Sequence, residues 1–348
     1  MSASPSGSRE RSDRTLAKAA TQVNVVRHPH LQSVVVRSRQ ATGARQRDGV
    51  PPVPSRLSLI VLLFAVSPLF AANGSAPTAT PGPCPADAGW SEPTRPAHIF
   101  ANTWYVGTCT ISAILVTSPK GHILIDAATD AAAPAIEANI RALGFRLADI
   151  RYLVNSHEHY DHIGGLARLQ HDTGATVVAR EPAATALERG SNDETDPQSG
   201  ILEGFPAVAH VRRIADGESV TLGDLRLTAH ATAGHTAGST SWTWNACEGE
   251  TCHTLVYADS LTAVSRDSYR FSDHDDVVAA FRAAFETVAG LPCDILMTPH
   301  PGASGLLARI GPSATEALVD AGACKRYAES AATRLGARLA RERGQATP

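Results

Sequence analysis

The segment NSHEHYDHIGG, residues 155–165, contains three histidines and one aspartate within six consecutive positions. It follows the apolar run RYLV, residues 151–154, and it precedes the helical pattern LARLQ, residues 166–170. The order predicts a strand, a loop and then a helix. Ligands of open α/β sheets lie at the carboxyl ends of strands. The sequence therefore places this cluster of side chains at the rim of a sheet.

The spacing within the cluster predicts two neighbouring metal positions. His157 and His159 alternate along an extended segment, so both imidazoles point the same way and can bind one cation. Asp161 and His162 follow as the chain turns into the helix, which directs them to an adjacent point. Imidazole nitrogen and carboxylate oxygen are both ligands of zinc. Without a metal, several partly buried imidazoles would compete for few hydrogen-bond acceptors.

Two further histidines come directly after predicted strands and complete a candidate ligand set. TAGHTAGST, residues 232–240, supplies His235, and MTPHPGASG, residues 297–305, supplies His300. Loops at one rim of a sheet can bring these segments to the cluster. The isolated histidines are expected to be surface or satisfied core residues: His98, His122, His171, His210, His230, His253 and His274.

The hydrophobic pattern predicts a mixed α/β chain. Three β-rich runs, residues 98–107, 110–118 and 121–127, are separated by turn residues and predict an antiparallel meander. A helix is predicted from Ala131, with Pro134 in its first turn and Gly144 as its stop. Five later runs also read as strands, namely residues 176–179, 225–232, 240–246, 253–258 and 293–299.

Two more helices are predicted towards the carboxyl terminus. One follows Ser272 and has an apolar face at helical spacing, formed by Val277, Phe281, Ala284 and Val288. The other opens with a capping-box pair, Ser313 and Glu316, and runs towards Arg341. No repeat of solenoid length is present, so we expect one globular core.

Composition and charge exclude one class of partner. The 348 residues are 43% hydrophobic and 19% charged, which is typical of a globular protein. Residues 1–72 contain 10 of the 31 basic side chains and 3 of the 34 acidic ones, which leaves 21 basic and 31 acidic side chains and a net charge of −10 for the remainder. A protein that binds nucleic-acid phosphates requires the opposite sign, so no nucleic-acid partner is predicted.

The amino-terminal part predicts export. LSLIVLLFAVSPLFAANGSA, residues 57–76, has an apolar stretch that is short for a membrane span and interrupted by Pro68, as in a secretory signal. Ala72, Gly74 and Ala76 offer cleavage positions; the alternative is an uncleaved anchor. We expect residues 1–56 to be an upstream extension before the true start, 57–76 a signal peptide, 77–97 a leader arm and 98–348 the domain. The product is then periplasmic, without stable membrane association.

The cysteine content agrees with an oxidising compartment. Six cysteines fit three disulfides but allow fifteen connectivities: Cys84, Cys109, Cys247, Cys252, Cys293 and Cys324. Cys247 and Cys252 enclose a polar turn between two predicted strands, which makes a local pair natural there. Free buried thiols are the alternative.

Several longer segments share a resemblance with the histidine cluster. These are NTWYVGTC (102–109), GHILIDAAT (121–129), NIRALGF (139–145), SHEHYDH (156–162), TSWTW (240–244), YADSLTA (257–263) and CDILMTPHPGASGL (293–306). Over nearly all of residues 84–345 the chain resembles class B β-lactamases of subclass 3, within the metallo-β-lactamase fold superfamily. The resemblance implies a single α/β domain built as a four-layer αββα sandwich.

The resemblance also implies a site and a reaction. One zinc ion is expected on His157, His159 and His235, and a second on Asp161, His162 and His300, with a metal-bound hydroxide that attacks the β-lactam amide of penicillins, cephalosporins and carbapenems. Asp161 is expected to orient the hydroxide as well as bind metal, although ligation alone is the alternative. The resemblance further implies antibiotic resistance, disulfides Cys84–Cys109, Cys247–Cys252 and Cys293–Cys324, and substrate contacts at Ser260 and Thr262, for which hydroxyls that cap backbone groups are the alternative. Gln198 is expected to line the rim as a further substrate contact, with a solvated loop as the alternative. The protein is expected to be a monomer.

Two other functions remain open on the sequence. A lactonase or a thioesterase resembling glyoxalase II shares the fold and the metals, and a carboxylate of Asp259 bridging both metals favours it. With Asp259 outside the ligand set, the β-lactamase is favoured. The second is an exported zinc-binding protein without activity. A nuclease is disfavoured by the negative charge and the predicted signal.

Overall fold

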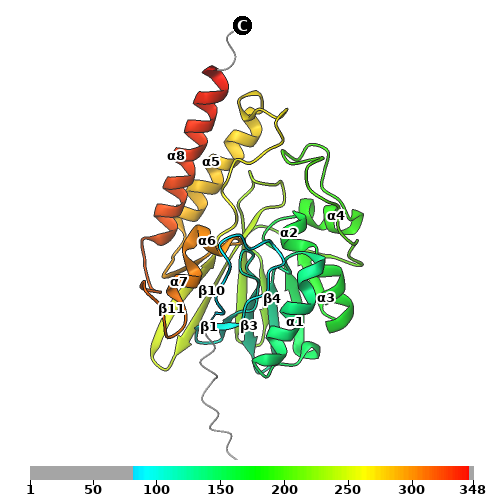
Figure 1. Cartoon of the computed structure of the whole chain (residues 1–348), viewed down its shortest axis with the longest axis vertical. Helices are drawn as coiled ribbons and strands as arrows, with labels where there is room; N and C mark the ends of the chain where they lie inside the picture. The colour runs from blue at the N-terminus through cyan, green and yellow to red at the C-terminus, as the bar shows by residue number, and fades with distance from the viewer. Residues whose placement is uncertain (1–80, 345–348) are drawn as a thin grey trace, which may run out of the picture. The chain divides into compact units, whose positions relative to one another are not determined.

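The computed structural model describes residues 81–344. Two β-sheets pack face to face, and helices cover the outer face of each sheet (Figure 1). The four-layer αββα sandwich is confirmed for the described part of the chain, which forms one domain. Residues 1–80, which include the predicted extension, the signal peptide and the start of the leader arm, lie outside the described residues. No helix within residues 81–344 is both long and apolar enough to cross a membrane.

The first sheet has seven strands in chain order. They are β1 (Ala97–Phe100), β2 (Thr103–Tyr105), β3 (Ile114–Ser118), β4 (Gly121–Ile125), β5 (Ile150–Val154), β6 (Thr176–Ala179) and β7 (Arg212–Arg213). Strands β1 to β4 pair antiparallel, as the predicted meander requires, and β4 to β7 pair parallel. The first β-rich run is divided into β1 and β2 because the chain turns at Ala101, whose φ is +49°. The carboxyl ends of β4 and β5 therefore meet at one edge.

The second sheet has five strands in the order β12-β11-β10-β9-β8. Their bounds are β8 (Ser219–Leu222), β9 (Leu225–Ala231), β10 (Thr240–Glu248), β11 (Thr251–Tyr257) and β12 (Ile295–Met297). Strands β9, β11 and β12 run in the same direction, since β10 pairs antiparallel with β9 and β11 and β12 pairs parallel with β11. Their carboxyl ends also share one edge. The short strands β7 and β8 were not predicted.

Eight helices complete the described chain. They are α1 (Ala133–Ala142), α2 (Tyr160–Ile163), α3 (Leu166–Thr173), α4 (Glu181–Arg189), α5 (Asp275–Gly290), α6 (Pro301–Ser304), α7 (Leu306–Arg309) and α8 (Ala323–Gly344). Figure 1 shows α1 and α3 beside the first sheet and the long α5 and α8 on the opposite side. Three separate apolar clusters fill the spaces between the four layers. The middle cluster, which includes the buried Trp242 and Tyr257, joins the two sheets.

The predicted start of the last helix is wrong. Ser313 and Glu316 lie in turns, and α8 begins at Ala323. The Arg309 guanidinium donates hydrogen bonds to the carbonyls of Ala317 and Leu318, so this segment is held without helical pairing. A tertiary contact overrides the local capping signal.

The apolar face of α5 differs slightly from the prediction. Phe281, Ala284 and Val288 are buried as expected, whereas Val278 replaces Val277 at the amino-terminal end of the buried face. Val277 is only partly buried against the same cluster.

Three disulfides staple the periphery of the domain. The pairs are Cys84–Cys109, Cys247–Cys252 and Cys293–Cys324, the same three that the resemblance implies. Cys247 and Cys252 are direct partners at the end of the β10–β11 hairpin. Cys293–Cys324 attaches the first turn of α8 to the segment before β12, and Cys84–Cys109 attaches the otherwise irregular residues 81–96 to the domain.

Candidate metal centre

Strand ends from both sheets bring the predicted ligands together. His157 and His159 follow β5, and helix α2 then begins at Tyr160 and carries Asp161 and His162. His235 follows β9 and His300 follows β12. Because these strands end at the same rim of the sandwich, six side chains from three separate segments meet there.

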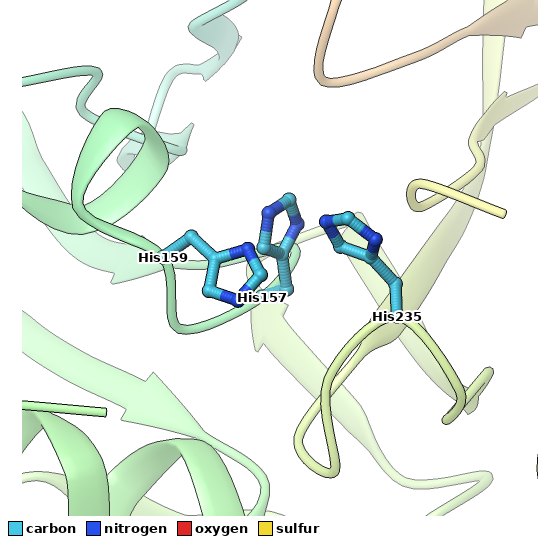
Figure 2. A group of neighbouring side chains, drawn as sticks. All are labelled: His157, His159 and His235. Atoms are coloured by element: carbon cyan, nitrogen blue, oxygen red, sulfur yellow. The ribbon is translucent and has the colours of Figure 1, made fainter. Parts of the chain in front are cut away.

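His157, His159 and His235 form what we call the first triad. One nitrogen atom from each lies within 4.8 Å of the others, and each residue is at most 6% exposed. Figure 2 shows that His157 and His159 come from one loop, whereas His235 comes from a separate loop across from them. Three buried imidazoles with converging nitrogens fit the ligand preference of zinc.

The outward nitrogens of the first triad each have an acceptor in the protein. His157 Nδ1 lies 2.8 Å from Asp259 Oδ1, and His235 Nδ1 lies 2.8 Å from the Thr262 carbonyl oxygen. His159 Nε2 lies 3.1 Å from Asp196 Oδ2. These acceptors favour the tautomer in which the outward nitrogen of each ring carries the proton. The opposite nitrogen then has the lone pair that can bind a metal ion.

Asp161, His162 and His300 form the second triad. Asp161 Oδ2 lies 3.1 Å from His162 Nε2 and 3.5 Å from His300 Nε2, and the two Nε2 atoms are 3.3 Å apart. In a tetrahedral zinc site, neighbouring ligand atoms are about 3.4 Å apart. The triangle of donor atoms therefore has the size of one face of such a site. His157 is also within 4.8 Å of the ligand atoms of Asp161 and His162, so the two triads adjoin.

Burial keeps most of these imidazoles neutral. Burial lowers the pKa of His235 to about 3 and the pKa of His300 to about 4, and the neighbouring histidines add to the effect. The pKa of His157 is also well below its usual range, first through burial and then through His162. Neutral imidazole is the form that binds a metal ion.

Asp161 and His162 shift each other in opposite directions. Burial lowers the pKa of His162, but Asp161 and Asp126 outweigh it and raise the pKa well above its usual range. Burial raises the pKa of Asp161, yet His162 outweighs it and leaves that pKa below its ordinary value. Without a metal, the second triad therefore holds an ion pair of carboxylate and imidazolium at neutral pH. A metal ion that binds there displaces a proton.

The predicted substrate contacts lie around the triads. Gln198 is buried, and its Nε2 is 3.4 Å from His159 Nδ1. Ser260 is buried directly after β11, and Thr262 is half-buried with its Oγ1 3.4 Å from His235 Nδ1. Their side chains stand at the same rim as the ligands.

Glu158 points away from the triads. It accepts hydrogen bonds from Thr236 Oγ1 at 2.6 Å and from the Gly238 N–H at 2.8 Å, and so it braces the loop that carries His235. A side chain at Gly238 would meet Glu158 and Ala183 at less than 3 Å, so only glycine fits this close approach.

Asp196 and Asp126 are site residues that the sequence did not reveal. Asp196 contacts His159 from the loop in which Gln198 was the only residue predicted to belong to the site. Asp126 follows β4 with a φ of +60° and accepts hydrogen bonds from Ser156 N–H, Ser156 Oγ and Tyr257 OH, each at 2.7 Å. Its position at a strand end was the available signal, since the other ligands share it.

Comparison with known proteins agrees with this geometry. The family model described as the metallo-β-lactamase superfamily matches residues 106–300. The chain belongs to this superfamily. Among curated proteins, one from Burkholderia pseudomallei named "Probable metallo-hydrolase" is 31% identical over 145 residues, which are 37% of this chain and 46% of that protein. The chain thus matches about half the length of this curated relative.

Solved members of the superfamily match over nearly their full length. The metallo-β-lactamase MIM-1 from Novosphingobium pentaromativorans is 52% identical, with a TM-score of 0.71, over 74% of this chain and 94% of MIM-1. SMB-1, bound to 2-mercaptoethanesulfonate, is 48% identical, with a TM-score of 0.71, over 73% of this chain and all of SMB-1. MEM-A1, a subclass B3 enzyme from a soil metagenome library, is 42% identical, with a TM-score of 0.70, over 74% of this chain and all of MEM-A1.

Proposed function

We propose that this superfamily member hydrolyses the amide bond of β-lactam antibiotics (penicillins, cephalosporins and carbapenems) with two zinc ions and thereby confers antibiotic resistance. The observation that carries the proposal is the pair of adjoining triads, joined to 42–52% identity with metallo-β-lactamases over nearly their whole chains. Within subclass 3, the segments quoted from the sequence most resemble the Adelaide imipenemase, and this finer relation stays a prediction.

The donor set of each triad fits zinc. The first triad offers three converging imidazole nitrogens, and the second offers two nitrogens and a carboxylate oxygen at tetrahedral spacing. When bound, a pair of such ions ionises water near pH 7 and polarises the substrate carbonyl. Asp161 has a ligand atom within 4.8 Å of that of His157, and its second oxygen can accept a hydrogen bond from the attacking hydroxide and orient it. No covalent bond to the protein is required.

The remaining residues bind and orient the substrate. Thr262 presents a hydroxyl group beside His235, and Ser260 lies two positions earlier in the segment after β11. Both hydroxyls suit hydrogen bonding to the carboxylate that β-lactams carry. Gln198 presents an amide beside His159 on the opposite side. Asymmetric contacts of this kind hold the scissile amide over the triads in one orientation.

The lactonase or thioesterase alternative is disfavoured by the position of Asp259. Its Oδ1 is 2.8 Å from the outward nitrogen of His157, so this carboxylate holds a ligand from behind. The β-lactamase function remains favoured.

We infer that the enzyme acts in the periplasm as a monomer after the signal at residues 57–76 is cleaved. The support is the apolar segment itself and the three disulfides, which form and persist in oxidising compartments. Determining the amino terminus of the mature protein by mass spectrometry, after expression of the full chain in a bacterium, tests the cleavage.

A substrate panel tests the proposed activity. The purified enzyme is assayed with nitrocefin and imipenem beside a lactone and a thioester, with and without a chelator, and its metal content is measured by elemental analysis. We expect β-lactam turnover that the chelator abolishes and about two zinc ions per chain. Preferential cleavage of the lactone or thioester contradicts the proposal. Stoichiometric zinc without any turnover indicates the inactive binding protein.

A further inference from the structure

The loop between α4 and β7 controls one ligand of the first triad. It carries Asp196 and Gln198, which contact the two ring nitrogens of His159 at 3.1 Å and 3.4 Å. A shift of this loop rotates the His159 ring or removes its acceptor. The metal geometry of the first triad therefore depends on what keeps the loop in place.

The carboxyl-terminal part of this loop packs into the core, where Phe205 and Val208 join the apolar cluster beside the first sheet. The amino-terminal part, residues 192–200, contributes no residue to an apolar core cluster. A cavity of about 660 Å³ borders its inner side, with Asp196 and Pro197 in one wall and Arg266, Tyr269 and Val277 in another. None of the six predicted metal ligands or three predicted substrate contacts lines this cavity. Residues 192–200 thus lack the dense apolar contacts that fix core segments.

Arg266 spans the wall of this cavity and ties the loop to the opposite segment. Its backbone N–H donates to the Pro197 carbonyl at 2.9 Å, and its Nη1 donates to the Asp196 carbonyl at 2.9 Å. The guanidinium lies over the Tyr269 ring, 5.4 Å from the centroid. Within the described part of the chain, residues 192–200 form hydrogen bonds with their own loop and with α4. Outside these two elements, their hydrogen-bond partners are Arg266 and His159 alone.

The segment that carries Arg266 is itself anchored. Arg338 of α8 donates from Nη2 to Ser265 Oγ at 3.0 Å and to the Tyr269 carbonyl at 3.3 Å. Four residues before Arg266, the Thr262 carbonyl accepts the hydrogen bond of His235 Nδ1. The acceptors of two first-triad histidines thus sit on two loops, and Arg266 connects these loops.

We propose that Arg266 is a positioning residue that clamps the loop carrying Asp196 and Gln198 to the segment carrying Thr262, and so sets the geometry of the first triad. Its catalytic consequence rests on the proposed function. Its structural consequence does not, because the clamp exists before any metal or substrate binds.

Hydrogen exchange of the metal-free full-length protein tests the clamp directly. The Gln198 amide donates to Asp196 Oδ1 at 2.7 Å and the Ser199 amide donates to the Asp196 carbonyl at 2.9 Å, so both report on the loop. In Arg266→Gln we expect both amides to exchange about 10-fold faster. Arg266→Lys, which retains a cation, should lie between this variant and the wild type. The exposed Arg282 of α5 provides the control Arg282→Gln, which should leave both rates unchanged.

Cobalt(II) binding extends the test to the metal site. Competition with a chelator should show about 10-fold weaker binding at the first triad of Arg266→Gln, an altered absorption spectrum of the bound cobalt, and little change at the second triad. Unchanged amide exchange together with unchanged cobalt affinity overturns the proposal. If the wild type hydrolyses no β-lactam but the exchange effect appears, the clamp stands and the proposed function falls. Circular dichroism shows whether Arg266→Gln is folded. If it is not, the amide exchange and cobalt affinity of Arg266→Lys provide the test instead.

Discussion

The two triads lie side by side but are held in different ways. Each histidine of the first triad is buried and has an acceptor behind it, two of which are the carboxylates of Asp259 and Asp196. In the second triad, Asp161 and His162 pair with each other, and the side chain of His300 is 42% exposed. The first triad is therefore organised before metal binds, whereas the second is charged and has one partly exposed ligand, His300.

The difference predicts a division of labour between the two positions. A preorganised set of neutral ligands binds tightly because little is rearranged when the metal arrives. A set that must first release a proton and break an internal ion pair binds more weakly. We therefore expect the first triad to retain its metal under conditions that empty the second.

Removing Asp161 should produce the largest separation between the triads. In Asp161→Ala the second triad loses its only anionic ligand and the first keeps all three imidazoles. We expect loss of one metal ion and a fall in kcat of about 10³-fold, corresponding to about 4 kcal/mol of transition-state stabilisation. Elemental analysis and steady-state kinetics measure both effects. Asp224→Ala, at an exposed turn, is the matched control, and a near-wild-type rate for Asp161→Ala removes this residue from the mechanism.

Removing Asp259 should weaken mainly the first triad. In Asp259→Ala the buried Nδ1 of His157 loses a hydrogen-bond acceptor at 2.8 Å, so the ring is free to rotate or change tautomer. We expect 10–100-fold weaker binding at the first triad by chelator competition. Asp259→Asn keeps an acceptor oxygen and should lose less. An equal loss at both triads contradicts independent support of the two positions.

Acidification should empty the second triad first. The pKa of metal-free His162 is raised, so this ring is protonated below that pKa and the metal must displace the proton; affinity then falls about 10-fold per pH unit as pH decreases from 8 to 6. The pKa values of His157 and His235 are lowered, so these two rings stay neutral over that range and release no proton when metal binds. Calorimetric titrations at several pH values measure both affinities. Parallel losses at the two positions contradict the prediction.

Truncating Thr262 should have the smallest effect on the metals. The bond that holds His235 comes from the Thr262 carbonyl, which Thr262→Ala retains. We expect metal affinities within about 2-fold of wild type, with KM for a β-lactam raised about 5-fold through loss of one hydrogen bond. Thr262→Ser keeps the hydroxyl and should restore KM. A large loss of metal in Thr262→Ala shows that the hydroxyl, 3.4 Å from His235 Nδ1, supports the first triad.

Much of the ligand set could be predicted from the sequence because it depends on local rules. His157 and His159 share a face by alternation, α2 redirects Asp161, and strand ends place His235 and His300 at one rim. The same rules placed the longer strands of both sheets and the helices α1, α3 and α5, whereas α4, α6, α7 and the short strands β7 and β8 were not predicted. Each signal lies within about ten residues of the feature that it predicts.

The local rules failed where side chains bind backbone groups, or distant residues, that no sequence pattern marks. The capping box at Ser313 is a valid helix signal, but Arg309 binds the carbonyls that follow it and α8 starts later. Asp196 carries no motif, and it reaches His159 across 37 positions of sequence. Arg266 likewise acts through carbonyl groups, which every residue has, so no residue pattern could identify its partners.

The sequence by itself determined which side chains can bind metal and at which edge of the sandwich they gather, since strand period and strand direction follow from neighbouring residues. Only the tertiary structure decided how each ligand is held. The acceptors behind His157 and His159 are 102 and 37 residues away, and the proton on His162 depends on burial and on Asp161. Such properties arise from long-range packing and the exclusion of water, which local sequence does not encode.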